Sequence, residues 1–385
     1  MGKNSERKKM KKILFLIHDL GQGGAEKVLV NLVNHMDRSK FDISVTVLFG
    51  GGVNEKFLTK DICFRAVFPK EFPGNSKFMK LMSPEQLHKI CVKDSYDIEI
   101  SYLEGPSARV ISGCKNSNTK LISWIHVEQH TMDRLSRSFR NEREARKCYN
   151  RFDQTICVSQ YVRDDFCKIM DFQMPCKVLY NTVESDKILE WSQQPENELL
   201  EDENIRLIAV GTLKRSKGYM RLLDIIRRLR DKKYPVHLYI LGTGPLQLEM
   251  EKFIRKNELK NVVTMLGYQT NPYKYIRNCD LFVCSSYAEG FSTATTEALI
   301  LGIPVCTVEV SGMREMLGNN EYGIITDNMD EALYAAIERL LSNPELLKHY
   351  KEKAIERGKM FSTEITVKKV EDFFESLVEK DTGIN

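Results

Sequence analysis

Short apolar runs rich in β-branched residues alternate with longer segments of helical periodicity along most of the chain. This order is typical of parallel β-sheets with helices on both faces. One series of candidate strands comprises residues 13–17, 43–49, 98–101, 121–125, 155–158 and 177–180, and a second comprises 206–210, 236–241, 262–266, 281–284, 305–308 and 323–326. We therefore predict an α/β protein with two Rossmann-like, doubly wound domains whose sheets face a ligand cleft.

A polar segment without strand character separates the two series. It includes Gln193-Gln194-Pro195-Glu196-Asn197-Glu198 and the acidic run Glu201-Asp202-Glu203. A length of 385 residues fits two domains of about 100–200 residues each. We predict a basic tip at residues 1–12, an N-terminal domain at 13–184, a linker at 185–204, a C-terminal domain at 205–362, and a last helix with its tail at 363–385. The last helix carries an apolar face formed by Val367, Val370, Phe373, Phe374 and Leu377.

Composition excludes several classes of protein. The 57 basic and 53 acidic residues leave a net charge of +4, which is too small to indicate nucleic acid as a partner. No apolar stretch approaches the roughly 18 residues needed to span a bilayer, and the run at 13–17 is too short for a signal-peptide core. We expect a cytoplasmic protein, either free or bound peripherally to the inner face of the cell membrane. The ten cysteines lack Cys-x-x-Cys or other metal spacing, so we expect buried free thiols and no metal.

Two turns that follow strands have the composition of anion sites. Gly21-Gln22-Gly23-Gly24 precedes a helix, where free N–H groups favour an anion, although a plain tight turn explains the same residues. A dinucleotide fingerprint would need glycine where Glu26 stands. The second turn runs from Gly211 to Gly218 and holds the cations Lys214, Arg215 and Lys217. It predicts a phosphate-binding loop without Walker spacing, and a merely solvated basic loop is the alternative.

The strongest signal is a pair of carboxylates eight positions apart, Glu289 and Glu297. Between them, residues 290–293 supply backbone N–H groups and hydroxyls at the start of a helix, which is another anion site. Carboxylates beside an anion site are electrostatically unfavourable unless they bind neutral hydroxyl groups. The arrangement therefore indicates a ligand with sugar or ribose hydroxyls next to a phosphate.

These motifs, in this order, resemble those of the retaining glycosyltransferases of family 4 (glycosyl transferases group 1), which have the GT-B fold. The resemblance rests on the Glu-x7-Glu pair, Gly-x-Leu-x-x-x-Lys-Gly at 211–218, the glycine-rich first turn and Gly-Ile-Pro-Val at 302–305, and it covers about residues 11–380. It implies that the C-terminal domain binds a nucleotide-sugar donor and the N-terminal domain binds the acceptor. It also implies that the last helix crosses back to the N-terminal domain.

By the same resemblance, Glu297 binds the ribose and Glu289 contacts the donor sugar's hydroxyls near the reacting centre. Lys217 binds the diphosphate, and His126 binds the donor sugar. The other implied donor-binding residues are Gly23, Gly24, Thr212, Arg215, Gly290, Phe291, Ser292 and Thr293. Thr212 departs from the pattern, because many relatives have arginine there as a second phosphate ligand; Arg215 or Lys214 is the candidate replacement.

The resemblance implies transfer with retention of configuration and without a metal or other cofactor, in agreement with the lack of an Asp-x-Asp motif. We expect the donor to be a UDP-sugar, or less readily a GDP-sugar, carrying a hexose or N-acetylhexosamine. The expected acceptor is a saccharide, carried on a polyprenyl diphosphate, in the assembly of a capsule or another cell-surface polysaccharide. A nucleotide-sugar epimerase of the same fold and a catalytically inactive glycan-binding module are the alternative functions.

A second basic feature lies between residues 132 and 152. Seven basic and three acidic residues give this helical stretch a net charge of +4. A solvated helix face is one interpretation. The other is a surface for anionic lipid headgroups or for an acceptor's pyrophosphate, with Arg143, Arg146 and Lys147 as its candidate residues.

Overall fold

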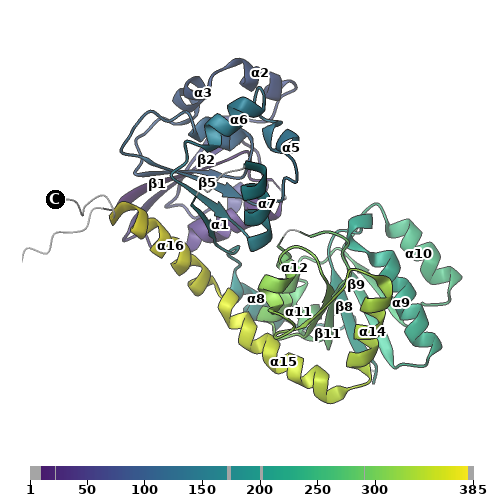
Figure 1. The fold of residues 1–385 in the computed structure, drawn as a ribbon. Coiled ribbons are helices and arrows are strands. Elements are labelled where there is room, and N and C mark those ends of the chain that lie inside the picture. The colour runs from purple at the N-terminus through teal and green to yellow at the C-terminus, as the bar shows by residue number, and fades with distance from the viewer. Residues whose placement is uncertain (1–9, 22, 171–174, 200–202, 290, 380–385) are drawn as a thin grey trace, which may run out of the picture. The chain divides into compact units, whose positions relative to one another are not determined.

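The computed structural model describes residues 10–21, 23–170, 175–199, 203–289 and 291–379. The chain divides into two compact units. Unit 1 contains residues 1–183 together with 363–385, and unit 2 contains residues 184–362. Each unit is a parallel sheet with helices packed against it (Figure 1), so the predicted α/β fold class is confirmed.

Unit 1 is built on a seven-stranded parallel sheet with the order β3-β2-β1-β4-β5-β6-β7. Its central strand β1 is fully buried from Ile13 to Ile17, because helices cover both faces of the sheet. The strands are β1 (Lys11–Ile17), β2 (Phe41–Phe49), β3 (Cys63–Phe68), β4 (Ile98–Tyr102), β5 (Lys120–Ile125), β6 (Gln154–Cys157) and β7 (Cys176–Val178).

The helices of unit 1 include the last helix of the chain, α16. The ring of Phe374 on α16 packs edge-on against Phe15 of β1, with ring centroids 6.2 Å apart. The apolar face predicted for this helix is therefore buried against the sheet of unit 1. The helices are α1 (Gly24–His35), η1 (Glu55–Phe57), α2 (Asn75–Leu81), α3 (Pro84–Cys91), α4 (Pro106–Ile111), α5 (Met132–Ser136), α6 (Glu142–Tyr149), α7 (Gln160–Met170) and α16 (Thr363–Glu379).

Unit 2 is built on a six-stranded parallel sheet with the order β10-β9-β8-β11-β12-β13. Its strands are β8 (Ile205–Val210), β9 (Val236–Leu241), β10 (Val263–Gly267), β11 (Leu281–Cys284), β12 (Val305–Val308) and β13 (Ile324–Thr326). Its helices are α8 (Ser185–Ser192), η2 (Arg215–Lys217), α9 (Tyr219–Asp231), α10 (Gln247–Lys256), α11 (Tyr273–Arg277), α12 (Thr293–Ile300), α13 (Met313–Leu317), α14 (Asp330–Leu341), α15 (Pro344–Gly358) and η3 (Lys359–Phe361).

The strand orders locate the ligand-binding edge of each sheet. The order reverses between β1 and β4 in unit 1 and between β8 and β11 in unit 2. Loops that leave neighbouring strands at such a switch point diverge to opposite faces of the sheet and leave a crevice at its carboxyl edge. The switch points therefore single out the loops after β1 and β4, and those after β8 and β11.

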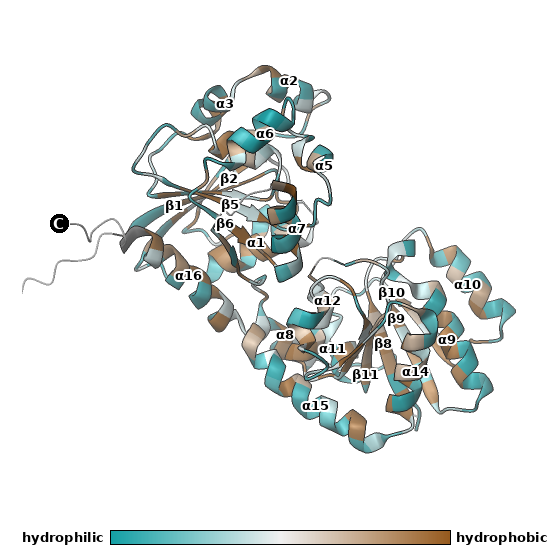
Figure 2. Ribbon diagram, in the orientation of Figure 1, coloured by the Kyte–Doolittle hydropathy of each residue, from teal (hydrophilic) through white to brown (hydrophobic). Residues whose placement is uncertain are grey.

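Hydropathy follows this layering (Figure 2). The strands of both sheets are coloured as hydrophobic, whereas the helices are hydrophobic on one side and hydrophilic on the other. Every strand expected from the sequence overlaps an observed strand. Within the described part of the chain, no helix combines the length and the apolar character needed to cross a bilayer.

Three local expectations need correction. Strand β3 was not predicted, because it is an edge strand whose residues stay partly exposed and include Arg65. The segment expected as a linker, 185–204, begins with helix α8, whose Ile188 is buried in unit 2. The single helical stretch expected from 132 to 152 is two helices, α5 and α6.

Candidate active site

The two loops at the switch point of unit 2 hold one another in place. Gly218 adopts a left-handed φ of 67°, and a Cβ atom there would lie 1.9 Å from the carbonyl oxygen of Ser285. The Ser285 hydroxyl donates to the carbonyl of Lys217 over 3.0 Å, and the N–H of Tyr287 donates to the carbonyl of Ser216 over 2.7 Å. Glycine is required at 218 because only a residue without a side chain permits this contact.

A buried arginine that sequence reasoning missed supports the second of these loops. The side chain of Arg221 on α9 is 1% exposed. Its guanidinium donates to the carbonyls of Ser285 (2.7 Å) and Ser286 (2.9 Å) and to the Asn328 side chain (2.8 Å). The only sequence signal is a lone arginine on the otherwise apolar face of α9, and such a position is usually read as solvent-exposed.

Lys217 and Glu289, predicted to serve the same ligand, are brought together. The Nζ of Lys217 lies 2.5 Å from Oε1 of Glu289, and the Ser286 hydroxyl donates to the same oxygen over 2.5 Å. Their side chains are 24% and 9% exposed. Charge-assisted hydrogen bonds with so little solvent contact are stronger than ordinary surface ion pairs. The adjoining cavity, which Tyr219 and Ser292 also line, has a volume of about 20 Å³.

Helix α12 begins beside this pair. Ser292 is its N-cap and accepts a hydrogen bond from the N–H of Thr295 over 3.3 Å. Phe291 is 9% exposed and packs against Phe361, so its side chain anchors the loop. Gly290, also predicted to bind the donor, lies outside the described residues. Thr293 is the first residue of α12, where helix N–H groups lack partners within the helix.

Glu297 lies farther along α12 and is half-buried. The hydroxyl of Tyr273 donates to its Oε1 over 3.3 Å. Burial and the nearby charge of Glu297 raise the pKa of Tyr273, so this tyrosine remains a neutral donor. Tyr273 is another residue that the sequence motifs did not reveal.

The other cations of the second turn are not gathered at this pair. Arg215 is 84% exposed and bonds to Glu249 on α10 over 3.2 Å. Lys214 and Thr212 are exposed as well. Gly242 allows the loop after β9 to pack on this turn, because a Cβ there would lie 2.1 Å from the carbonyl oxygen of Gly211. Of the three clustered cations, the structure places only Lys217 against the carboxylate of Glu289.

The glycine-rich turn of unit 1 is occupied by carboxylates. Gly23 is the N-cap of α1 and Gly24 its first residue. A Cβ on Gly23 would lie 1.9 Å from a carboxylate oxygen of Glu26. Burial raises the pKa of Glu26, with a further contribution from the charge of Asp19. An acidic side chain therefore lies directly against Gly23 in this structure.

His126 lies at the carboxyl edge of the same sheet, directly after β5, and is buried. Its ring packs against Tyr102, with centroids 4.6 Å apart, and against Trp124 at 6.2 Å. Burial lowers the pKa of His126 to about 3, so the ring is neutral. Among the described residues its Nε2 atom has no hydrogen-bond partner. A buried ring nitrogen without a partner is available to a ligand.

Glu104 is a further residue that the sequence did not single out. It accepts the backbone N–H of His126 and the side-chain amide of Gln129, each over 3.1 Å. Burial raises the pKa of Glu104. The adjacent Leu103 has a φ of 108°, which is uncommon for a branched residue and marks local strain. Glu104 thus fixes the loop that begins with His126.

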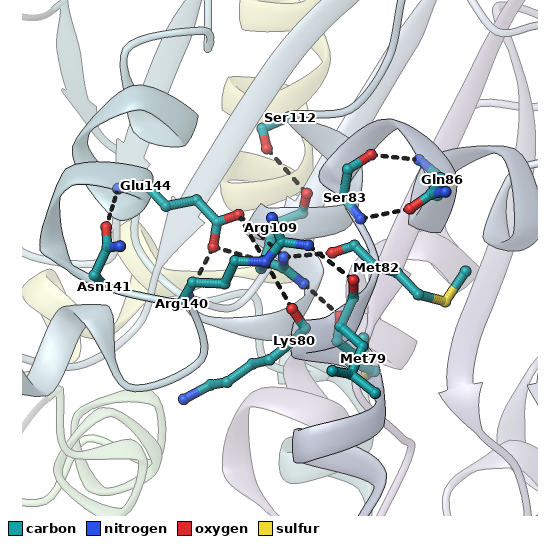
Figure 3. Close-up of polar contacts among 11 residues, drawn as sticks. Met79, Lys80, Met82, Ser83, Gln86, Arg109, Ser112, Arg140, Asn141 and Glu144 are labelled. Atoms are coloured by element: carbon teal, nitrogen blue, oxygen red, sulfur yellow. Dashed lines mark hydrogen bonds and ion pairs between the residues drawn. The ribbon is translucent and has the colours of Figure 1, made fainter.

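Three of the seven basic residues between 132 and 152 donate hydrogen bonds to carbonyls inside unit 1, namely Arg140, Arg146 and Arg151. Arg140 donates to the carbonyls of Lys80 and Leu81, and the nearby buried Arg109 pairs with Glu144 over 3.0 Å (Figure 3). Arg146 donates to the carbonyl of Met170 over 2.8 Å. Arg146, one of the three candidate residues for a lipid or pyrophosphate surface, is thus partly engaged inside unit 1. Arg143 and Lys147, in contrast, are exposed.

The two parallel-sheet α/β units match the fold of the GT-B class of glycosyltransferases. The family model for glycosyl transferases group 1 matches residues 191–357, and the model for glycosyltransferase family 4 matches residues 22–187. The chain belongs to this glycosyltransferase family.

Individual proteins agree with this assignment. The chain is 28% identical, over 91% of its length and 96% of the relative's, to the Campylobacter jejuni N-acetylgalactosamine-N,N'-diacetylbacillosaminyl-diphospho-undecaprenol 4-alpha-N-acetylgalactosaminyltransferase. It is 27% identical to the Staphylococcus aureus capsular polysaccharide biosynthesis glycosyltransferase CapM, over 49% of this chain and 50% of CapM. Anabaena HepE in complex with UDP shares the fold, with a TM-score of 0.74 at 18% identity over 95% of this chain and 100% of HepE.

Proposed function

We propose that this glycosyltransferase moves a hexose or N-acetylhexosamine from a UDP-sugar to a saccharide on a polyprenyl diphosphate, with retention of configuration, in cell-surface polysaccharide assembly. The observation that carries the proposal is the contact between Lys217 and Glu289 at the switch point of unit 2. The UDP bound to HepE supports the choice of nucleotide, and the diphospho-undecaprenol acceptor of the Campylobacter relative supports the choice of acceptor.

The donor would lie across the loops after β8 and β11. Lys217 would bind the diphosphate, Glu289 the hydroxyls of the sugar, and Glu297 those of the ribose. The cavity beside Lys217 and Glu289 is small, about 20 Å³, so we propose that a donor separates these two side chains as it binds. Lys217 would then exchange Glu289 for the diphosphate, and Glu289 would exchange Lys217 for the sugar hydroxyls. These new hydrogen bonds would offset the free energy needed to separate the ion pair.

Residues of this chain would stabilise the charges that develop on the donor during transfer. Lys217 and the free N–H groups at the start of α12 stabilise the departing diphosphate, so we propose that the reaction needs no metal ion. The diphosphate accepts the proton of the attacking acceptor hydroxyl. Glu289 stabilises cationic character at the anomeric carbon. His126 offers Nε2 as a hydrogen-bond acceptor or donor, depending on its tautomer, to a sugar hydroxyl.

A panel of UDP- and GDP-sugars, each incubated with the full chain with and without a polyprenyl-diphosphate-linked saccharide, tests the proposal. We expect nucleotide release from at least one UDP-sugar, faster when acceptor is present. Mass spectrometry should show one added sugar, and NMR should show the donor's anomeric configuration in the product. Dialysis against EDTA should leave the rate unchanged. An inverted product, or an altered nucleotide sugar without transfer, would contradict the proposal, and the latter would indicate an epimerase.

We also propose that part of the described surface of unit 1 docks the enzyme on anionic lipid. Arg143 and Lys147 on α6 are exposed. Leu81, at the end of α2, is 80% exposed, and Arg140 holds its carbonyl against the loop before α6. An exposed apolar side chain whose backbone is bonded to Arg140, with two further exposed cations on the helix that follows Arg140, suits an interface of acyl chains and anionic headgroups.

A further inference from the structure

Three cysteines converge at one edge of the sheet of unit 1, away from the residues assigned to sugar transfer. Cys157 ends β6, Cys176 begins β7, and Cys167 lies on α7, the helix that connects these strands. In the parallel register Thr155 pairs with Cys176, so the side chains of Cys157 and Cys176 project from the same sheet face. The Sγ atoms of Cys167 and Cys176 are 3.5 Å apart.

The three thiols differ in exposure. Cys157 is fully buried, whereas Cys167 and Cys176 are partly exposed because β7 is an edge strand. Seven of the ten cysteines are buried, and Cys63 is exposed without a neighbouring thiol in hydrogen-bond contact. Cys167 and Cys176 are thus a thiol pair that a small oxidant can reach.

The local hydrogen bonds also give Cys167 and Cys176 different pKa values, and therefore different reactivities. A hydrogen bond from the thiol of Cys157 lowers the pKa of Cys176 to about 7. Burial raises the pKa of Cys167 to about 11, with a further contribution from its hydrogen bond to Cys176. Because the thiol of Cys167 donates a hydrogen bond to the Cys176 sulfur, Cys176 is favoured as the thiolate that attacks an oxidant, and Cys167 is the thiol that resolves the product.

We infer that Cys167 and Cys176 form a dithiol site that a peroxide converts reversibly to a disulfide. The sulfur of Cys176 attacks one peroxide oxygen, the O–O bond breaks, and the departing hydroxide takes a proton to become water. The sulfur of Cys167 then attacks the sulfenic acid, the S–O bond breaks, and a second water leaves with the thiol proton. Two electrons pass from the two sulfurs to the peroxide.

The geometry requires little movement. A disulfide has an S–S distance of about 2.05 Å, so the two sulfurs must approach by about 1.5 Å. The bond would tie α7 to the edge strand β7, and a dithiol reductant would release it.

The chain's own trypsin sites make the test selective. Arg163, Lys168 and Lys177 place the two cysteines on separate peptides, 164–168 and 169–177, and Cys157 on a third, 152–163. The reduced full-length protein is treated with hydrogen peroxide, quenched with N-ethylmaleimide and digested without reductant. We expect a linked pair of peptides 164–168 and 169–177, with a mass loss of about 2 Da that dithiothreitol reverses.

Variants complete the test. Cys167→Ser or Cys176→Ser should abolish the linked pair, and Cys63→Ser should leave it unchanged. Cys157→Ala should still form the pair, but several-fold more slowly, because Cys176 loses the hydrogen bond that favours its thiolate. The inference is wrong if N-ethylmaleimide still alkylates both Cys167 and Cys176 after a peroxide treatment that has oxidised Cys63. It is also wrong if peptide 152–163 is the one linked to 169–177. This readout does not depend on glycosyl transfer and so stands apart from the proposed function.

Discussion

At the scale of single residues, the candidate site depends on a contact that sequence could not describe. The Glu-x7-Glu spacing identified Glu289, and the basic turn identified Lys217, but only the folded chain puts them 2.5 Å apart. Sequence distance hides this contact because the two residues lie on loops that leave different strands. Ser286 and Arg221, which orient the same carboxylate and its loop, are ordinary residues in sequence and gain their roles from position.

Replacing Glu289 tests its proposed role in the reaction. Glu289→Ala should lower kcat by about 10²–10³-fold and raise the donor KM by a smaller factor, because it removes a group that stabilises charge in the transition state together with a contact to the sugar hydroxyls. Steady-state kinetics with the donor found in the panel above measures both constants. Unchanged turnover would exclude Glu289 from the chemistry.

Two matched variants make this result specific. Glu297→Ala should mainly raise the donor KM, by about tenfold, since the ribose contact would be present in both ground and transition states. Glu249→Ala, which removes only the exposed partner of Arg215, should change kcat and KM by less than about twofold. Equal losses in all three variants would indicate a general effect on folding.

At the scale of elements, a few buried charges join the helices of unit 1 to one another and to its sheet. Arg109 on α4 bonds to Glu144 on α6 and to carbonyls of Met79 and Met82, and so fixes the turn between α2 and α3 (Figure 3). His88 on α3 bonds to Glu99 on β4 over 2.7 Å. Such pairs are invisible in hydrophobic periodicity, because a buried arginine or histidine reads as a polar surface position.

The His88–Glu99 pair predicts a pH dependence of stability. Although burial lowers the pKa of His88, hydrogen bonds to Cys114 and Glu99 raise it to about 9, above the ordinary value of 6.5. The stabilisation is therefore fully present below about pH 6.5 and is lost as the pH rises through about 9. His88→Gln should reduce the free energy of unfolding by about 3 kcal/mol at pH 6.5, and by much less at pH 10.

Urea denaturation of the wild-type chain and the variant at the two pH values measures this difference. The double difference isolates His88, since the other groups that titrate between these values are present in both proteins. His35→Gln is the control, because His35 contacts a backbone carbonyl on its own helix and no carboxylate. An equal loss for His88→Gln at both pH values would contradict the assignment of a charged pair.

At the scale of the whole molecule, the chain passes from unit 1 to unit 2 and returns to unit 1 with α16. Although the net charge is only +4, the basic residues lie in several different environments. Some cations lie at the candidate donor site, several arginines bind carbonyls inside unit 1, and a smaller number remain exposed on α6. The proposed membrane docking depends on this last group and on the apolar end of α2.

Flotation with vesicles containing an anionic phospholipid tests the docking surface. The wild-type chain should float with anionic vesicles at about 0.1 M salt, less at about 0.5 M, and little with neutral vesicles. Leu81→Ser and the double variant Arg143→Gln/Lys147→Gln should each reduce the bound fraction. For Leu81 the expected loss in affinity is about tenfold, from the apolar area withdrawn from water.

Matched variants in unit 2 provide the control. Leu248 on α10 is 69% exposed, so Leu248→Ser repeats the chemical change on another surface. Lys252→Gln/Lys256→Gln removes two exposed cations of the same helix. Both should leave flotation unchanged. Equal effects in the two units, or equal recovery with neutral and anionic vesicles, would rule out docking through α2 and α6.

The sequence by itself determined the two parallel sheets, the three informative turns and the Glu-x7-Glu pair. Each of these features depends on residues close together in the sequence: apolar runs of strand length, glycines at turns, and charges at the start of a helix. The tertiary structure decided which strand neighbours which, and hence that the loops after β8 and β11 meet. It also decided that Arg146 is bound internally, that Glu104 supports His126, and that two cysteines nine positions apart are in contact. These facts depend on burial and on contacts between distant segments, which periodicity along one chain does not record.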